Sequence, residues 1–383
     1  MKKFSTRIFS IGLVTLLLCM PFSTAAKAVN GNSSPWKIVP GTNEWQHLNS
    51  HDEMVAVCQL SDDQITSMGT DDLLNALLTY PLLIDMFVCD SLQSGFELIR
   101  SNFDGIEELL TRPDASEVIA RKYASTPAFS TSKSTATNES YATGFLCVDV
   151  LETLLAQPEI YDKMSSSELA AVNFEILEKH NQRTASGLYD DAFLEVREEL
   201  TGKNYSAICA DLTSKSPVYQ QAKTIFLSDL AQPLASTYVT TPKGTKVNVS
   251  KPLFELTSAK RRELDEYVKN TYPGATLLAS ATRKYNCHSY AWYSQSTSNP
   301  YWMDDPSAYM RDGSYKSGGF KVNNKIYYST PGYEHSGVVT GVKVGMAGCY
   351  VTSKWGNAGL VSHFYNYCPY FKNSAQISYW ERA

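Results

Sequence analysis

The sequence predicts an α+β protein, in which helices fill the N-terminal half and an antiparallel sheet fills much of the last hundred residues. Two observations support this prediction. Apolar residues recur at helical spacing through most of residues 45–231, and short runs rich in β-branched and aromatic residues follow residue 320. A chain of 383 residues also has room for two domains with buried cores.

The first 28 residues have the pattern of a cleavable secretory signal peptide. Residues 8–20 form an apolar run that follows three basic side chains, Lys2, Lys3 and Arg7. Ala26-Lys27-Ala28 then fits the small-x-small rule for signal peptidase, and the residues before Cys19 do not fit a lipoprotein signal. The apolar run is too short for a comfortable membrane span, and no later stretch is long and apolar enough. We therefore expect a secreted or cell-wall-associated protein with no stable membrane span.

The expected mature chain, residues 29–383, is acidic. Removing the four basic residues of the signal changes the formal net charge from −5 to −9, and the remaining basic residues are not clustered. Binding to phosphate backbones needs a basic footprint, so we expect no nucleic-acid partner. The sequence implies no cofactor, and it leaves the oligomeric state open.

The cysteine count predicts at least one unpaired thiol. Without Cys19, seven cysteines remain, and an odd number cannot all pair within one exported chain: Cys58, Cys89, Cys147, Cys209, Cys287, Cys349 and Cys368. The four that lie in the helical half are expected to be buried small hydrophobes. Cys349 and Cys368 flank a probable hairpin and could form a disulfide, whereas Cys287 has the least core-like neighbours.

Residues 29–235 are expected to form a helical domain whose role the sequence leaves open. Four leucines between Leu73 and Leu78 have helical spacing. Thr70 is expected to cap this helix, and Pro81 to end or restart it. The scattered histidines of this half are expected to be structural: His47, His51 and His180.

Residues 236–256 are expected to form an extended or hairpin connector, because β-branched residues surround a Pro-Lys-Gly turn. The domain boundary is placed here. The second domain, residues 257–383, is expected to begin with a helix that Thr257 or Ser258 caps and a Pro-Gly pair closes.

The segment "KYNCHSYAWY" (residues 284–293) places Cys287 at the start of a predicted helix. The positive end of the helix dipole favours the thiolate there, and unpaired backbone N–H groups, including that of Cys287, can bind an oxyanion. A nucleophilic thiolate also needs an imidazole partner, and His335 begins a predicted strand in "EHSGVV". A third polar group should orient that imidazole, and the following strands offer Ser353, Asn357 and His363.

This order of a helix cysteine, a strand histidine and a later strand polar residue resembles the papain-like superfamily in its circularly permuted form. That form includes the NlpC-type cell-wall peptidases and the CHAP amidases. The matching pieces are "NCHSYA", "EHSGVV" and "TSKWG", which begin at Asn286, Glu334 and Thr352. The resemblance covers about residues 257–383. It implies a nucleophilic Cys287 and a general base His335 that cleave amide bonds in peptidoglycan stem peptides or cross-bridges.

The sequence departs from that family pattern in two places. Asn286 stands where an Asp usually precedes the nucleophile. The third residue is commonly a second histidine soon after the first, whereas here the orienting residue is either Ser353 or His363, which lies one strand later. The chain also resembles secreted proteins of Gram-positive bacteria that join a helical region to a "CHSYAW…HSGVV…SKWG" tail, a resemblance that supplies no substrate.

The sequence therefore predicts a secreted cysteine peptidase or amidase that acts through a thioester, with the Cys287 N–H and Asn286 supporting the oxyanion site. Residues 298–319 are expected to be a long loop at the mouth of the site. One alternative is a papain-like binding or adhesion module without catalysis. A less favoured alternative is a zinc protein that uses soft ligands from Cys287, His288, His335 and His363, although His288 is expected to point away from Cys287 and to hydrogen-bond locally.

Overall fold

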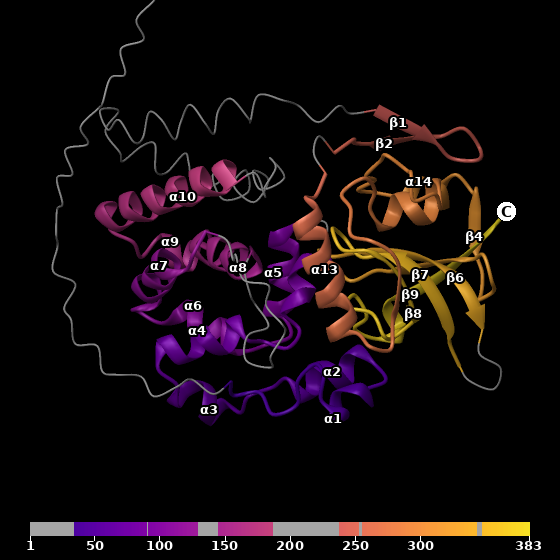
Figure 1. Ribbon diagram of the computed structural model, residues 1–383. Coiled ribbons are helices and arrows are strands. Elements are labelled where there is room, and N and C mark those ends of the chain that lie inside the picture. The colour runs from indigo at the N-terminus through magenta and orange to yellow at the C-terminus, as the bar shows by residue number, and fades with distance from the viewer. Residues whose placement is uncertain (1–33, 90, 129–144, 187–236, 253–254, 343–346) are drawn as a thin grey trace, which may run out of the picture. The chain divides into compact units, whose positions relative to one another are not determined.

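The computed structural model describes residues 34–383, except residues 90, 129–144, 187–236, 253–254 and 343–346 (Figure 1). The predicted signal peptide and Cys209 lie outside the described residues. No helix in the described part is long and apolar enough to cross a membrane. The described chain contains helices and an antiparallel sheet, so the α+β class is confirmed.

The N-terminal half consists of short helices. They are α1 (Asn43–Gln46), α2 (His51–Val57), α3 (Asp62–Ser67), α4 (Thr70–Leu78), α5 (Leu92–Arg100), α6 (Gly105–Thr111), α7 (Ala115–Ser125), α8 (Phe145–Leu155), α9 (Pro158–Tyr161) and α10 (Ser166–Ser186), with a 3-10 turn η1 (Leu83–Phe87) before α5. Hydroxyl side chains cap several of them by accepting a backbone N–H of the first turn: Thr42, Ser50, Ser61 and Ser91.

Helix α4 confirms the predicted apolar face and corrects its cap. Its four leucines from Leu73 to Leu78 are buried. The cap residue is Gly69, and Thr70 is instead the first helical residue, where its hydroxyl donates to Asp114 at 2.7 Å. The threonine thus ties two segments together and does not satisfy the backbone at the helix start.

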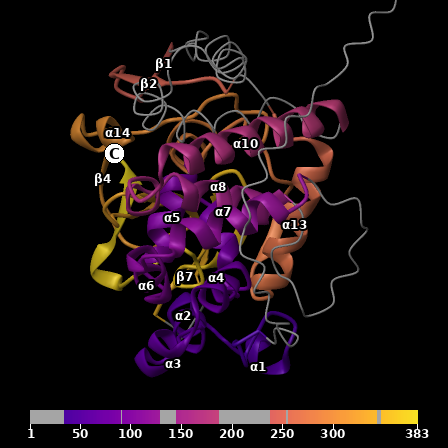
Figure 2. The same ribbon diagram turned by 90° about the vertical axis from the view of Figure 1, so that its left-hand side faces the viewer.

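The connector contains the hairpin that the sequence predicts. Strands β1 (Thr237–Thr240) and β2 (Lys246–Val249) pair antiparallel. In both views the hairpin lies beside α14 (Ser307–Arg311) (Figures 1 and 2), and Thr241 donates a hydrogen bond to Asp312. Helix α13 (Ser258–Thr271) follows, capped by Thr257 as predicted.

The C-terminal sheet has seven strands in the order β3-β8-β7-β6-β5-β9-β4, each antiparallel to its neighbours. Its strands are β3 (Thr276–Ala279), β4 (Tyr315–Ser317), β5 (Lys325–Tyr328), β6 (His335–Val342), β7 (Cys349–Lys354), β8 (Leu360–Phe364) and β9 (Ile377–Arg382), and a 3-10 turn η4 (Ser374–Gln376) precedes β9. Helix α14 and strand β4 lie within residues 298–319, so the prediction of a long loop there is wrong in part.

One hydrophobic cluster takes members from both predicted domains. Trp45 in α1 donates its indole N–H to the carbonyl of Thr271 at 2.7 Å, and Tyr370 donates its hydroxyl to the carbonyl of Val88. His51 binds Asp85 at 2.8 Å inside this core, so it is structural as expected. A division into two domains at residues 236–256 stays a prediction.

The sheet has two different faces, because successive strand residues point to opposite sides. We call the side that packs on the large cluster the core face, and its members include Tyr328, His335, Val351, Ser353 and His363. We call the other side the pocket face. It bears the smaller cluster and includes Tyr315, Lys325, Tyr327, Ser336, Val338 and Trp380.

Candidate functional site

Cys287 lies at the start of a short helix, as predicted. Residues 287–288 are helical and lead into the π-helical turn η3 (Ser289–Tyr293). The Asn286 side-chain oxygen accepts the backbone N–H groups of Ser289 and Met303, each at 3.1 Å, while its amide donates to the Met303 carbonyl at 2.9 Å. Asn286 therefore caps the helix and anchors the segment at Met303.

This capping explains why an amide suits position 286 better than a carboxylate would. An amide can accept two N–H groups and still donate to a carbonyl, whereas an ionised carboxylate can only accept. An Asp at position 286 would place a negative charge against the Met303 carbonyl in a fully buried site.

The Cys287 side chain is buried, and it is not in a disulfide with any described cysteine. Its helix packs on the pocket face, because His288 and Trp292 both hydrogen-bond Ser336 of that face. The pKa of Tyr327 is raised to about 12. Burial is the main cause, and negative charges on Glu334 and Cys287 add to it. The thiol therefore lies near Tyr327 on this side.

His335 points to the core face. Its fully buried ring stacks on Tyr370, with centroids 3.7 Å apart and planes at 6°. Among the described residues neither ring nitrogen has a hydrogen-bond partner, so the expected bond to Cys287 is not formed. Burial, and then His363 and His288, hold the pKa of His335 well below its usual range, which keeps the imidazole neutral.

Ser353 and His363 bind each other and do not bind His335. The His363 Nδ1–H donates to the carbonyl of Phe364 at 2.9 Å, so Nε2 carries the lone pair and accepts the Ser353 hydroxyl at 2.9 Å. Trp355 donates its indole N–H to the same hydroxyl at 3.1 Å. Burial lowers the pKa of His363 to about 4.

A second arrangement of the same kind lies on the pocket face. Trp292 donates its indole N–H to Ser336 at 2.8 Å, and the Ser336 hydroxyl lies 2.7 Å from His288 Nδ1. Burial lowers the pKa of His288 to about 4, with an opposing effect of Asp305. The sequence predicts a local hydrogen bond for His288, and this is wrong, because its partner Ser336 lies 48 residues away in the sequence. The i to i+4 spacing of His288 and Trp292 could have indicated that both face one partner, but nothing in the sequence indicated Ser336.

The zinc alternative finds no support in the geometry. Within the part of the chain that the structure describes, no three His, Cys, Asp or Glu side chains are grouped so that they could hold a metal ion. His335 and His288 lie on opposite sides of β6, so these candidate ligands do not converge.

The suggested disulfide between Cys349 and Cys368 is not formed. Both are buried thiols, and Cys349 contacts the Tyr379 hydroxyl at 3.8 Å. Burial raises the pKa of Cys349 to about 11 and raises that of Cys368 further. Cys58 and Cys89 are buried as expected, whereas Cys147 is partly exposed.

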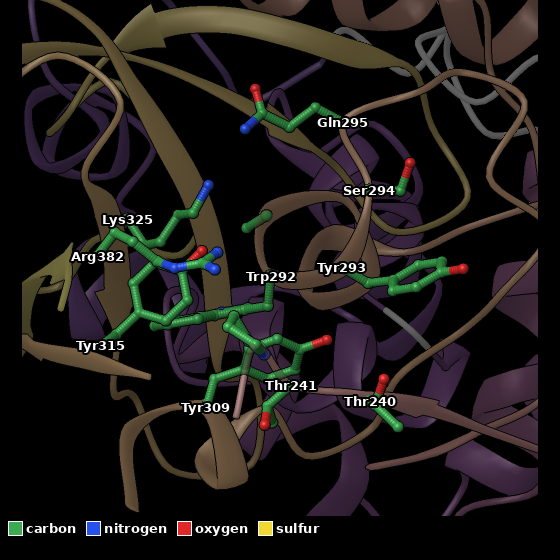
Figure 3. Close-up of a pocket in the computed structure, with 12 residues that line it drawn as sticks. Thr240, Thr241, Trp292, Tyr293, Ser294, Gln295, Tyr309, Tyr315, Lys325 and Arg382 are labelled. Atoms are coloured by element: carbon green, nitrogen blue, oxygen red, sulfur yellow. The ribbon is translucent and has the colours of Figure 1, made fainter. Parts of the chain in front are cut away.

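The structure also contains a pocket that the sequence did not reveal (Figure 3). Its volume is about 330 Å³, and it lies on the pocket face beside the end of η3. Its lining residues come from the β1 hairpin, η3, α14 and three strands, so they are scattered through the sequence: Thr240, Thr241, Pro242, Ala291, Trp292, Tyr293, Ser294, Gln295, Tyr309, Tyr315, Lys325 and Arg382. Tyr309 and Tyr315 belong to the segment that was expected to lie at the mouth of a site.

Comparison with known proteins assigns no family: no family model matches the chain, and no curated protein or solved structure matches it.

Proposed function

We propose that the chain is a secreted cysteine-dependent amide hydrolase with a papain-like C-terminal domain, in which Cys287 is the nucleophile and His335 the general base. The observation that carries this proposal is the state of His335. Its imidazole is fully buried, neutral, and without a hydrogen-bond partner at either nitrogen among the described residues.

An unsatisfied buried imidazole is costly and calls for a reason. A buried polar group without a partner typically costs about 1–3 kcal/mol, and such groups are rare in native proteins. A neutral ring with an unused lone pair is the state that a general base needs before it takes a proton. The position of Cys287 at a helix start is the second support, because the thiolate is favoured there.

The proposed reaction begins when His335 takes the Cys287 proton. The thiolate attacks the amide carbon, and the Cys287 backbone N–H helps to hold the oxyanion. The amine leaves with the proton from His335, which produces a thioester, and water then hydrolyses the thioester with His335 again as base. Because His335 lies on the core face of β6 and Cys287 lies on the pocket face, this scheme requires the start of β6 to turn over, so that the His335 ring leaves its stack on Tyr370 and reaches the thiol.

Peptidoglycan peptides are the proposed substrate, on the strength of the family resemblance of residues 286–291 and 334–339. The chain without residues 1–28 should release new amino groups from muropeptides, and Cys287→Ala should abolish that release. Cys147→Ala, which removes a partly buried thiol elsewhere, is the matched control and should retain activity. Equal release by the wild-type protein and Cys287→Ala would contradict the proposal.

A binding module without catalysis is the second candidate, and one observation favours it. The thiol and imidazole are not hydrogen-bonded, and His335 packs in the core as an aromatic ring would. In that case Cys287→Ala would bind muropeptides as well as the wild-type protein does, and neither would cleave them.

A further inference from the structure

The pocket on the pocket face has a marked imbalance of charge. Lys325 and Arg382 both line it, and no carboxylate is among its lining residues. The nearby Asp312 is already engaged, because it accepts the Thr241 hydroxyl and the Ser314 backbone N–H. Glu381, next to Arg382, instead pairs with Lys316 at 3.4 Å and Lys321 at 3.3 Å.

Two largely buried polar side chains at the pocket have no hydrogen-bond or ion-pair partner in the part of the chain that the structure describes. Lys325 is only 5% exposed, and its ammonium group faces the Tyr315 ring with no hydrogen bond or ion pair within the described residues. Tyr309 is 1% exposed, and its hydroxyl likewise has no partner there. Burial and then Arg382 lower the pKa of Lys325 to about 8, which a bound anion would reverse.

The walls of the pocket are aromatic. Trp292 and Tyr315 meet edge to face with centroids 5.2 Å apart, and Lys325 and Arg382 lie 6.0 and 5.8 Å from the centre of the Tyr315 ring. Figure 3 shows Lys325 and Gln295 extending toward the same space above these rings. Such walls accept a flat or apolar body while the polar groups fix one charged end.

We propose that this pocket binds a small carboxylate attached to a ring, with Lys325, Arg382 and the Tyr309 hydroxyl receiving the carboxylate and the aromatic walls receiving the ring. The inference is independent of the proposed hydrolase activity, since Cys287 is not among the lining residues. Two sources share this chemistry, a sugar acid and the C-terminal carboxylate of an aromatic peptide.

A carboxylate fits better than a phosphate. Phosphate sites commonly use the backbone N–H groups at a helix N-terminus. Here the pocket meets η3 at its C-terminal end, Trp292 and Tyr293, so it lacks the free N–H groups that a helix start would offer there. The volume of about 330 Å³ lies near the lower limit for small-molecule sites and suits a single ring.

Calorimetric titration with two matched pairs of probes tests the proposal. Glucuronic acid is compared with glucose, and N-acetylphenylalanine with its neutral amide, while inorganic phosphate is a fifth probe. At least one carboxylate should bind, and its neutral counterpart should bind at least about tenfold more weakly, the effect of losing a charge-assisted hydrogen bond. Which acid binds identifies the source of the ligand. The proposal is overturned if neither acid binds at millimolar concentration, if acid and neutral counterpart bind equally, or if phosphate binds more tightly than both acids.

Variants then locate the binding. Lys325→Met should weaken the bound acid at least about tenfold, whereas Lys325→Arg should keep most of the affinity because it keeps the charge. Lys316→Met, on a nearby strand but paired with Glu381, is the matched control and should bind normally. Tyr309→Phe removes only an unpartnered hydroxyl, so it should fold normally and bind more weakly. Normal binding by both Lys325→Met and Tyr309→Phe would place the ligand elsewhere and refute the proposal.

Discussion

Each face of the C-terminal sheet carries a hydrogen-bond chain of the same three residue types. In each one a tryptophan donates to a serine, and the serine contacts a histidine. On the core face the chain runs from Trp355 through Ser353 to His363, and it ends on a backbone carbonyl, so both ring nitrogens of His363 are used. On the pocket face it runs from Trp292 through Ser336 to His288.

The two hydrogen-bond chains differ at their histidines. Within the described residues no hydrogen bond engages His288 Nε2, and Trp292 borders an open pocket. The core-face chain is closed at both ends and acts as structure. The pocket-face chain has an unused ring nitrogen at one end, lies next to Cys287 and borders the pocket, so this is the face on which a ligand can bind. His335 belongs to neither chain, which is why its lack of partners is informative.

The largest expected effect is a loss of folding stability in acid that the three buried histidines cause. The pKa values of His288, His335 and His363 are lowered by burial, so these groups are neutral when folded and take up protons on unfolding below pH 6.5. Their contribution to stability is complete above pH 6.5 and is lost as the pH falls toward 4. Each should lower the free energy of unfolding by up to roughly 1.4 kcal/mol per pH unit in that window.

Chemical denaturation at half-unit steps from pH 7.5 to 5.5 measures this slope above the range in which ordinary carboxylates titrate. It is done in a Glu263→Gln background, because burial raises the pKa of Glu263 to about 7 and gives that group an opposing slope. His335→Phe should flatten the slope and raise stability, because Phe keeps the stack on Tyr370 and removes two unpartnered polar atoms. A pH-independent stability in this range would contradict the burial of the three rings.

Replacing the serine of each hydrogen-bond chain by alanine should lower the free energy of unfolding by different amounts on the two faces. Ser353→Ala leaves the His363 nitrogen and the Trp355 N–H unpaired in a closed core, at a cost of about 3 kcal/mol. Ser336→Ala should cost about 1 kcal/mol, because water from the pocket can reach the Trp292 side. Urea denaturation compares the two, with Ser362→Ala on β8 as the control. Equal losses would show that the pocket face is as closed as the core face.

Local patterns predicted several elements but missed α14 and β4, and contacts between distant segments decided what could not be predicted. The hairpin, the Thr257 cap and the helix start at Cys287 followed from turn and capping residues. The face to which His335 points could not be read from "EHSGVV". Its first residues are buried on both sides of β6, so no alternation sets the face, and a shift of one residue reverses it.

The pocket escaped prediction for a related reason. Its charged and aromatic groups come from segments between Thr240 and Arg382 that meet only in the folded chain. Ser353 and His363 lie on neighbouring strands, so their pairing could have been predicted from the sequence. That Ser353 does not bind His335 became clear only from the structure, where the His335 ring stacks on Tyr370.

The most direct test of the proposed nucleophile is the rate at which iodoacetamide labels each cysteine between pH 5 and 9, resolved by peptide mass spectrometry. Cys58 and Cys368 serve as internal standards, because burial raises their pKa well above the ordinary thiol range. The account predicts that Cys287 alone labels fast near neutral pH and that His335→Phe, which preserves packing, slows this labelling. Labelling of Cys287 no faster than that of Cys349, or unchanged in His335→Phe, would contradict a Cys287–His335 pair and leave the binding module as the better account.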